Sequence, residues 1–414
     1  MRLLHTADWH LGATLGVVSR DAEQACFLDW LLGVLERERV DALLIAGDVF
    51  DAANPPAAAQ RLYYDFLAKC RARLPKLDVV VIGGNHDSAG RLDAPADLLA
   101  AFNVRVVGGV PRRGDKTLDF ERLLVPLTNT NGEVAAWCVA MPFVRPFDVG
   151  ASGDLVQGVM ALYAECFDVA RQKRQAGQAL VAMGHAFMVN GKVSDTERAI
   201  QRGNLDALPV ELFPPDVAYV ALGHLHRAQR VAGKKHVRYS GSPLPLSMNE
   251  RHYKHRVVLV DLDGERVRIT PLPIPRARDL HRIPKQGAAP LQVILEALRQ
   301  LPQKSDDDGR LPPLVEVHVA VDQPQPTLKA DIDKAVEDKA VEIVAIHVAY
   351  PQRGDTPPAD APIQNLHDLQ PSDVFLRCYR TKYKDEPPPA LCNAFRELLE
   401  QTQRECAPET SLSL

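Results

Sequence analysis
Over the first 275 residues, short runs of consecutive apolar residues alternate with longer stretches whose apolar positions recur at helical spacing. A short, continuously apolar run predicts a strand that is covered on both faces of its sheet. Between the first two runs, residues 26–35 place their large side chains on one face of a helix. This alternation predicts an α/β fold, with strands near residues 3–4, 42–46, 79–82, 180–183 and 218–222.

The clustered prolines Pro271, Pro273 and Pro275 mark the end of this region, because proline continues neither a helix nor a central strand. Beyond them the pattern predicts a helix, a strand, a charged helix and a second strand, at residues 291–298, 314–319, 328–340 and 343–348. Three consecutive prolines then precede an apolar helical face at 391–399. We therefore expect a first domain at residues 1–275, an α+β domain at 276–385 and a C-terminal helical segment at 386–414.

Each apolar run of the first region leads directly into glycines and polar residues. Because ligands of α/β sheets gather at the carboxyl ends of strands, these polar blocks can converge although they are far apart in the chain. The glycines let the backbone turn sharply and come close to a ligand. The five blocks are Asp8-Trp9-His10, Gly47-Asp48-Val49-Phe50-Asp51, Gly83-Gly84-Asn85-His86-Asp87, Gly184-His185 and Gly223-His224-Leu225-His226.

The side chains in these blocks are oxygen and nitrogen donors, and none is a thiolate. Such a set suits manganese, iron, zinc or magnesium rather than copper(I) or an iron–sulfur cluster. It offers too many ligands for one ion but enough for two, and an Asp carboxylate could bridge the pair. Two ions clamp a phosphoryl group and make hydroxide from water, and a free His can protonate the leaving oxygen. Each block alone is also typical of an ordinary turn, so the metal hypothesis depends on the ordered conjunction of all five.

Composition limits the classes of partner and compartment. The net charge of -4 gives no global attraction for nucleic acid, so any such binding must use a local basic surface. Seven Cys without a CxxC pair argue against a disulfide framework and a Cys-based zinc site. No apolar run could span a membrane and the first residues lack signal-peptide features, so we expect a cytoplasmic protein. No Gly-x-x-x-x-Gly-Lys-[Ser/Thr] loop occurs, so we expect any ATP hydrolysis to belong to a separate subunit.

In their order and residue types, the five blocks resemble the calcineurin-like metallophosphoesterase superfamily, whose pattern is DxH, GDxxD, GNHD/E, GH and GHxH. Within it, the chain is similar to the bacterial SbcD family of nuclease subunits, through residues 1–12, 46–51 and 239–244. The resemblance is strong over residues 1–275 and rests mainly on position and size beyond them. It implies a four-layer α/β/β/α metallophosphoesterase sandwich with a smaller α+β capping domain.

The resemblance also implies a role for each matched residue. The implied metal ligands are Asp8, His10 and His226 for one ion and Asn85, His185 and His224 for the other, with Asp48 as the bridge. His86 would protonate or stabilise the leaving oxygen, and Asp87 would fix the His86 ring. Archaeal relatives carry a His at the position of Asp51, whereas Asp is usual in the bacterial branch, so the role of Asp51 stays open.

The implied activity is hydrolysis of DNA phosphodiester bonds with two divalent ions, preferably Mn²⁺. Duplex ends would be degraded together with an SbcC-type coiled-coil ATPase, and hairpins and single strands would be cut internally. In relatives, C-terminal helices grip that partner, which makes the helix at 391–399 a candidate contact, although it could be a simple docking helix.

Two surfaces keep a structural interpretation beside the functional one. Relatives form homodimers through helices that correspond here to two apolar stripes, yet such stripes are also typical of plain core. Basic residues at 227–238 and 251–256 are either a rim that contacts phosphates or a solvated hairpin. The stripes are Tyr63, Phe66 and Leu67, and Leu98, Leu99 and Phe102.

Two other functions stay open. A cyclic-nucleotide phosphodiesterase or phosphatase could use the same metal core, but small-substrate relatives often lack a second domain. A scaffold with a vestigial metal site is the other alternative. The intact His86 and the complete ligand set argue against it.

Overall fold

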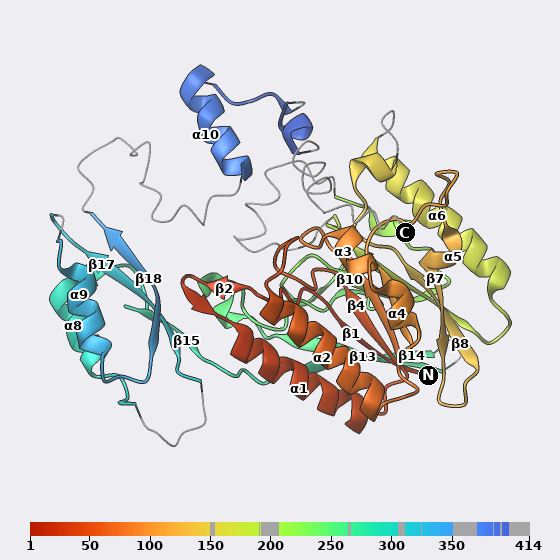
Figure 1. Ribbon diagram of the computed structural model, residues 1–414, viewed down its shortest axis with the longest axis horizontal. Coiled ribbons are helices and arrows are strands. Elements are labelled where there is room, and N and C mark those ends of the chain that lie inside the picture. The colour runs from red at the N-terminus through yellow and green to blue at the C-terminus, as the bar shows by residue number, and fades with distance from the viewer. Residues whose placement is uncertain are drawn as a thin grey trace, which may run out of the picture. The chain divides into compact units, whose positions relative to one another are not determined.

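The computed structural model describes residues 1–149, 154–189, 191, 207–263, 266–304, 311–323, 325–350, 371–383, 385–389 and 391–396. The chain forms two compact units, one of residues 1–199 with 205–351 and one of 200–204 with 352–414. The first unit contains two six-stranded sheets and a smaller four-stranded sheet (Figure 1). Within the described residues, no helix combines the length and apolar character that a membrane crossing requires.

The first six-stranded sheet has the order β14-β13-β1-β4-β5-β6. The strands β1, β4, β5 and β6 are parallel, and β13 returns antiparallel to β1. β14 pairs with β13 at the edge as an antiparallel hairpin. The strands are β1 (Arg2–Thr6), β4 (Ala42–Ala46), β5 (Asp78–Ile82), β6 (Val104–Val107), β13 (Arg256–Asp263) and β14 (Arg266–Pro273).

The second six-stranded sheet has the order β11-β12-β10-β9-β8-β7. Its four inner strands are parallel, and the edge strands β7 and β11 are antiparallel to their neighbours. The strands are β7 (Leu124–Thr128), β8 (Val134–Ala140), β9 (Ala179–His185), β10 (Val217–Gly223), β11 (Gln229–Arg230) and β12 (Val237–Tyr239).

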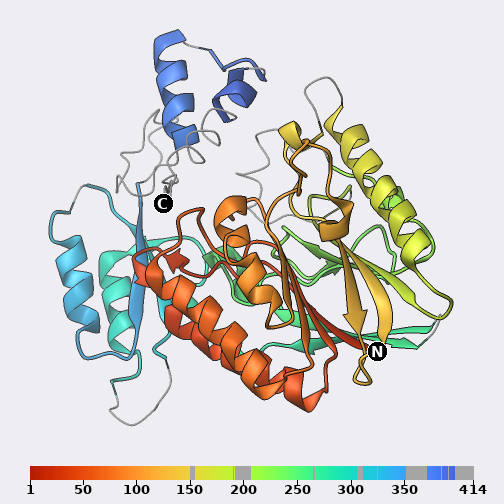
Figure 2. The same ribbon diagram turned by 45° about the vertical axis from the view of Figure 1, so that its right-hand side comes forward.

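Alternation along the strands builds the layers between and outside these sheets. In β4, Leu44 packs in the core shared with the second sheet, whereas Leu43 and Ile45 pack in a second core with α1 and α2. The second sheet is covered by α6, whose Phe167 joins the shared core. The arrangement is the predicted α/β/β/α sandwich (Figures 1 and 2). Its helices are α1 (Asp21–Arg37), α2 (Ala57–Arg73), α3 (Ala89–Asp93), α4 (Ala96–Ala100), α5 (Phe120–Leu123) and α6 (Leu155–Lys173).

All five strands predicted from apolar runs are confirmed as β1, β4, β5, β9 and β10. The structure adds a short hairpin that the pattern did not predict, formed by β2 (Thr14–Leu15) and β3 (Val18–Ser19).

The smaller sheet belongs to the predicted α+β region, and all its neighbouring strands are parallel to the central strand β17. Its helices α8 and α9 pack against Val315, Val317 and Val319 of β17. Helix α9 ends at Val336, earlier than predicted, and Lys339 instead forms a β-bridge with Gln303. The elements are β15 (Leu280–Ile283), β16 (Ala289–Pro290), α8 (Leu291–Arg299), β17 (Leu314–Ala320), α9 (Leu328–Val336) and β18 (Glu342–Ala349).

The second unit contains α10 (Pro371–Tyr383), which the sequence pattern did not predict. The predicted helix at 391–399 is observed over residues 391–396, and residues 397–399 lie outside the described part of the chain. The Phe375 ring of α10 stacks on the Phe395 ring with centroids 4.3 Å apart.

Candidate metal centre
The five polar blocks meet where β1, β4 and β5 of one sheet and β9 and β10 of the other end. Backbone hydrogen bonds join the first two blocks, since Asp8 N–H donates to the Gly47 carbonyl and His10 N–H donates to that of Asp48. Across the two sheets, the His224 N–H donates to Asp8 Oδ1 over 2.8 Å. The parallel strands therefore bring together residues that are far apart in sequence, as the position of the blocks predicted.

Four of the seven predicted ligands have a left-handed backbone. Asp8, His10, Asp48 and His224 have φ values of 54°, 46°, 49° and 103°. Such a conformation costs a residue other than glycine about 1–3 kcal/mol and persists only where the surrounding structure enforces it. Backbone strain of this kind clusters at functional sites, so it supports a site here independently of the residue types.

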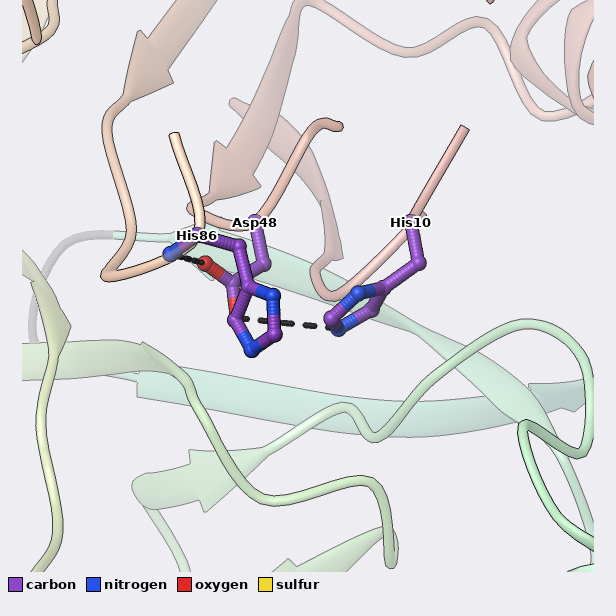
Figure 3. Close-up of side chains that lie close together, drawn as sticks. All are labelled: His10, Asp48 and His86. Carbon is purple, nitrogen blue, oxygen red and sulfur yellow. Dashed lines mark hydrogen bonds and ion pairs between the residues drawn. The ribbon is translucent and has the colours of Figure 1, made fainter. Parts of the chain in front are cut away.

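The Asp48 carboxylate lies between two groups of donors. Its Oδ2 is 3.6 Å from His10 Nε2 on one side and 3.3 Å from His185 Nε2 on the other. Its Oδ1 accepts the backbone N–H of His86 over 2.9 Å, which fixes the carboxylate plane. Figure 3 shows His10 and His86 close to this carboxylate, with dashed lines from Asp48 to the His86 backbone nitrogen and to the His10 ring. A carboxylate placed between two groups of donors could bridge two ions.

The other predicted ligands lie close to these residues. Asn85 Oδ1 is 3.0 Å from both His185 Nε2 and His224 Nδ1. The centroid of the His226 ring is 5.2 Å from that of His10. Asp8 Oδ1 is 3.9 Å from His185 Nδ1. All seven predicted ligands therefore lie in one cluster.

Several polar atoms in this cluster are buried without a hydrogen-bond partner among the described residues. They are Asp8 Oδ2, His10 Nε2 and His224 Nε2. An unsatisfied buried polar group costs about 1–3 kcal/mol, so these atoms fit ligands of a cation better than isolated core groups. Burial raises the pKa of Asp8 to about 7, against the opposing attraction of His185 and His226. Divalent cations would favour its ionised form, and the oxygen and nitrogen donors suit such ions.

Three of the histidines are oriented by a partner at Nδ1. His10 Nδ1 is 3.0 Å from Asp51 Oδ1, and His226 Nδ1 is 3.1 Å from Glu250 Oε1. His185 Nδ1 donates to the Ala46 carbonyl over 2.9 Å. A partner that accepts from Nδ1 leaves Nε2 free to bind a metal and fixes the ring direction.

Sequence reasoning left Asp51 without a role and missed Glu250 altogether. Glu250 is fully buried in the 3₁₀ helix Met248–His252 and also accepts the Leu246 N–H over 2.9 Å. Nothing in its local spacing marks it as a partner of His226, because the contact depends on the tertiary fold.

The prediction that Asp87 fixes the His86 ring is wrong. His86 Nδ1 donates instead to the backbone carbonyl of Asp51 over 2.8 Å. The buried Asp87 carboxylate accepts the backbone N–H groups of Val49, Phe50 and Gly84. Its side chain turns away from the His86 ring and joins the loop after β5 to the loop that carries Asp48.

Two glycines are required by close approach to the ligands. A Cβ atom at Gly84 would lie 2.1 Å from Asp48 Oδ1, and one at Gly47 would lie 2.2 Å from His185 Nδ1. Neither contact is sterically possible, so the blocks need glycine at these positions for packing around the ligands.

The structure separates the residues of the two apolar stripes. Tyr63, Phe66, Leu67 and Leu99 are buried core residues, whereas the residues at positions 98 and 102 stay on the surface. Leu98 is 66% exposed and Phe102 is 42% exposed.

Of the two basic segments, residues 227–238 contain the hairpin of β11 and β12, as one of the two interpretations predicted. Arg227 directly follows His226 and is exposed. Its guanidinium lies over the Tyr253 ring, 5.7 Å from the centroid.

Comparison with known proteins places this geometry in a family. Residues 1–228 match the family model described as calcineurin-like phosphoesterase, and residues 276–383 match the one described as type 5 capsule protein repressor C-terminal domain. A dimetal phosphatase structure from Danio rerio aligns with a TM-score of 0.42 and 14% identity, covering 67% of this chain and 99% of that one.

Two curated relatives are named as the SbcD component of the nuclease SbcCD. The Rhodobacter capsulatus protein is 40% identical over 392 residues, which cover 92% of this chain and 94% of the relative. The Escherichia coli K12 protein is 32% identical over 399 residues, which cover 93% and 94%. This chain therefore belongs to the SbcD family of SbcCD nuclease subunits, with a calcineurin-like phosphoesterase domain that implies divalent metal ions.

Proposed function
We propose that this chain is a dimetal DNA nuclease that hydrolyses phosphodiester bonds. The observation that carries the proposal is the Asp48 carboxylate, placed within 3.6 Å of a histidine nitrogen on each side. The curated relatives, named as nuclease subunits, support a nucleic-acid substrate. They match this chain through its second domain as well, which disfavours the small-substrate phosphodiesterase or phosphatase.

The division of the ligands between two ions follows the family resemblance, and the cluster around Asp48 supports a metal site there. Divalent ions bound there, which we propose to be Mn²⁺, would offset the charge of the phosphoryl group and lower the pKa of water. Asp51 and Glu250 hold the rings of His10 and His226 in the orientation that binding requires. The proposed ligands are Asp8, His10 and His226 for one ion, Asn85, His185 and His224 for the other, and Asp48 for both.

His86 is the proposed proton donor to the leaving oxygen. Its ring is partly exposed, and its Nδ1–H donates to the Asp51 carbonyl. This bond holds the ring against His10, with the centroids 4.8 Å apart, and leaves Nε2 to give a proton. Asp87 contributes indirectly by holding the two loops that carry His86 and Asp48 together.

The proposed substrates are duplex ends, degraded with an SbcC-type ATPase partner, and hairpins and single strands, which are cut internally. The relatives' name describes a subunit of a larger complex, which supports a partner. In the second unit, Val374, Tyr383 and Leu391 are exposed apolar side chains near a stacked Phe375–Phe395 pair. We propose that this helical unit binds the coiled coil of the partner.

Further proposals concern DNA contact, assembly, domain division and location. The exposed Arg227, next to the metal ligands, would contact a DNA phosphate. The exposed Leu98 and Phe102 would be covered in a homodimer.

The domain boundaries near residues 275 and 385 remain our proposal, as does a cytoplasmic location, which the six free thiols among the described residues support.

The decisive experiment is Mn²⁺-dependent cleavage of a labelled linear duplex and a hairpin by the purified chain and by His86→Gln. We expect at least a 100-fold loss of cleavage in the variant, as for removal of a general acid, with metal content unchanged at two ions per chain. His281→Gln replaces an exposed histidine of β15 and should cleave normally. Normal cleavage by His86→Gln would disprove the acid assignment.

The same experiment separates the rival functions. If the chain hydrolyses a cyclic nucleotide well and leaves DNA intact with the ATPase partner present, the nuclease proposal is wrong. If all substrates remain intact although two ions are bound, the scaffold function is favoured.

A further inference from the structure
The smaller sheet carries a second cluster of metal-ligand side chains, away from the centre described above. Alternation along β17 directs Val315, Val317 and Val319 into the core beneath α8 and α9. Glu316 and His318 therefore lie on the opposite face of the sheet. In Figures 1 and 2 both helices lie on one side of this sheet, which is the side away from Glu316.

Strand register brings a third donor to the same face. His347 of β18 pairs directly with His318 of β17, and Arg282 of β15 pairs with Glu316. The two imidazole rings stack with centroids 4.6 Å apart and planes inclined by 29°. Side chains from three neighbouring strands thus converge on Glu316.

The distances within this cluster are those of a shared ligand site. His347 Nε2 is 2.9 Å from Glu316 Oε1, and His318 Nε2 is 2.9 Å from Glu316 Oε2. One ligand atom from each of the three residues lies within 4.8 Å of the other two. The His318 Nε2 is buried and lies close to the carboxylate. It nevertheless has no hydrogen bond of suitable geometry among the described residues.

Arg282 completes the arrangement. Its Nε donates to Glu316 Oε2 over 2.6 Å, while Oε1 faces His347 Nε2 over 2.9 Å. A ligating carboxylate is usually held by such a hydrogen bond through its other oxygen. Glu316 is 7% exposed, so its charge is desolvated and must be offset by neighbouring groups.

We propose that Glu316, His318 and His347 bind a zinc-class divalent ion in the second domain. Two imidazoles and one carboxylate form a ligand set that suits Zn²⁺ and leaves one coordination position open. His347 is 54% exposed, so an ion can reach the site from solvent. All three ligands lie on the paired strands β17 and β18, so the ion would join these strands. The proposal does not depend on the nuclease activity.

The test is a count of Zn²⁺ ions bound per chain after removal of all metal, by equilibrium dialysis at micromolar Zn²⁺ with elemental analysis. We expect His347→Ala to bind one ion fewer than the unaltered chain, because it removes one of three ligands. The exposed position of His347 makes the variant safe for folding. The matched control is His281→Ala. It removes an exposed histidine of the same sheet, next to Arg282 in β15, and should lose no ion.

A second readout is the visible absorption of Co²⁺ bound in place of Zn²⁺. Relative to His281→Ala, both His347→Ala and His318→Asn should lose the absorption of one Co²⁺ ion, while the absorption of Co²⁺ in the dimetal centre remains. Equal ion counts in His347→Ala and His281→Ala, or binding that requires millimolar Zn²⁺, would overturn the proposal. If the dimetal assignment in the first domain is wrong, the total count falls, but the difference of one ion between these two variants remains.

Discussion
At the residue scale, His5 shows how a buried imidazole supports the sandwich without taking part in the metal cluster. It lies on β1, fully buried against β10, where Nδ1 is 2.9 Å from the Tyr219 hydroxyl and Nε2 is 3.2 Å from the Leu222 carbonyl oxygen. The hydroxyl donates to Nδ1, and the ring donates through Nε2. Burial lowers the pKa of His5 to about 3, so the ring is neutral in the folded protein.

This burial predicts a pH dependence of stability. Below about pH 6.5 the His5 ring binds a proton in the unfolded chain but not in the folded chain. Above that pH the ring is neutral in both states, so it does not lower the free energy of unfolding. As the pH falls from 6.5 towards 3, the free energy of unfolding drops, by about 2 kcal/mol at pH 5. Urea denaturation with a chelator present should show this loss in the unaltered chain. In His5→Gln the loss should be smaller by the same amount, and an equal pH dependence in the two proteins would contradict the assignment.

Asp51 has two contacts that a single substitution can separate. Its carboxylate orients His10, whereas its backbone carbonyl accepts from His86. Asp51→Ala removes only the carboxylate, so we expect Mn²⁺ affinity to fall by about 10–100-fold. Cleavage at saturating Mn²⁺ should keep its pH profile, because His86 retains its partner.

The measurement is metal binding together with the Mn²⁺ dependence of cleavage. Asp263→Ala, at an exposed position of β13, is the control and should bind Mn²⁺ normally. Unchanged Mn²⁺ affinity in Asp51→Ala would show that the contact with His10 does not orient a ligand.

At the element scale, the glycines after the strands differ from those within helices. A Cβ atom at Gly84 would clash with Asp48, whereas one at Gly33, in the middle of α1, would meet nothing within 4 Å. Gly84→Ala should displace the Asp48 carboxylate and reduce bound metal. Gly33→Ala should keep full metal content and raise the free energy of unfolding by up to about 1 kcal/mol. Metal analysis and denaturation of both variants test this, and full metal content in Gly84→Ala would contradict it.

The elements that the sequence predicts are those whose local pattern determines them. Continuous apolar runs such as 42–46 must be buried on both faces, so β4 and its neighbours could be predicted. The edge strand β14 has no fully buried residue and gives no such signal. The convergence of the polar blocks followed from the carboxyl ends of parallel strands. In contrast, the pairing of Glu250 with His226 and the direction of the Asp87 side chain depend on loop paths that no local pattern specifies.

At the scale of the whole molecule, the first unit contains a direct contact between the β2–β3 hairpin and the smaller sheet. Leu15 of the hairpin packs with Leu280, Leu314 and Val344 of that sheet in one apolar cluster. A Cβ atom at Gly16 would lie 2.0 Å from the Val344 carbonyl oxygen, so the hairpin touches the backbone of β18.

A buried ionic contact accompanies this apolar cluster. The guanidinium of Arg278, 6% exposed, lies 3.3 Å from Glu342 of β18 and 3.9 Å from Glu23 of α1. Glu23 is itself paired with Arg20 over 2.5 Å. These contacts hold Arg278, in the segment that leads into the smaller sheet, between α1 and β18.

A charge within the apolar cluster should therefore open this contact. Leu15 is 7% exposed, so Leu15→Asp would bury a carboxylate beside apolar side chains. The control is Val17→Asp, which alters the same hairpin at a position that is 77% exposed. Because Arg278 is buried, trypsin can cut the chain after it only when the contact opens. If the substitution makes opening easier by about 1.4 kcal/mol or more, cleavage after Arg278 becomes at least tenfold faster. Cleavage after the exposed Arg276 serves as the internal reference. We expect faster cutting after Arg278 in Leu15→Asp alone. Equal rates in the two variants would mean that the hairpin does not hold the smaller sheet in place.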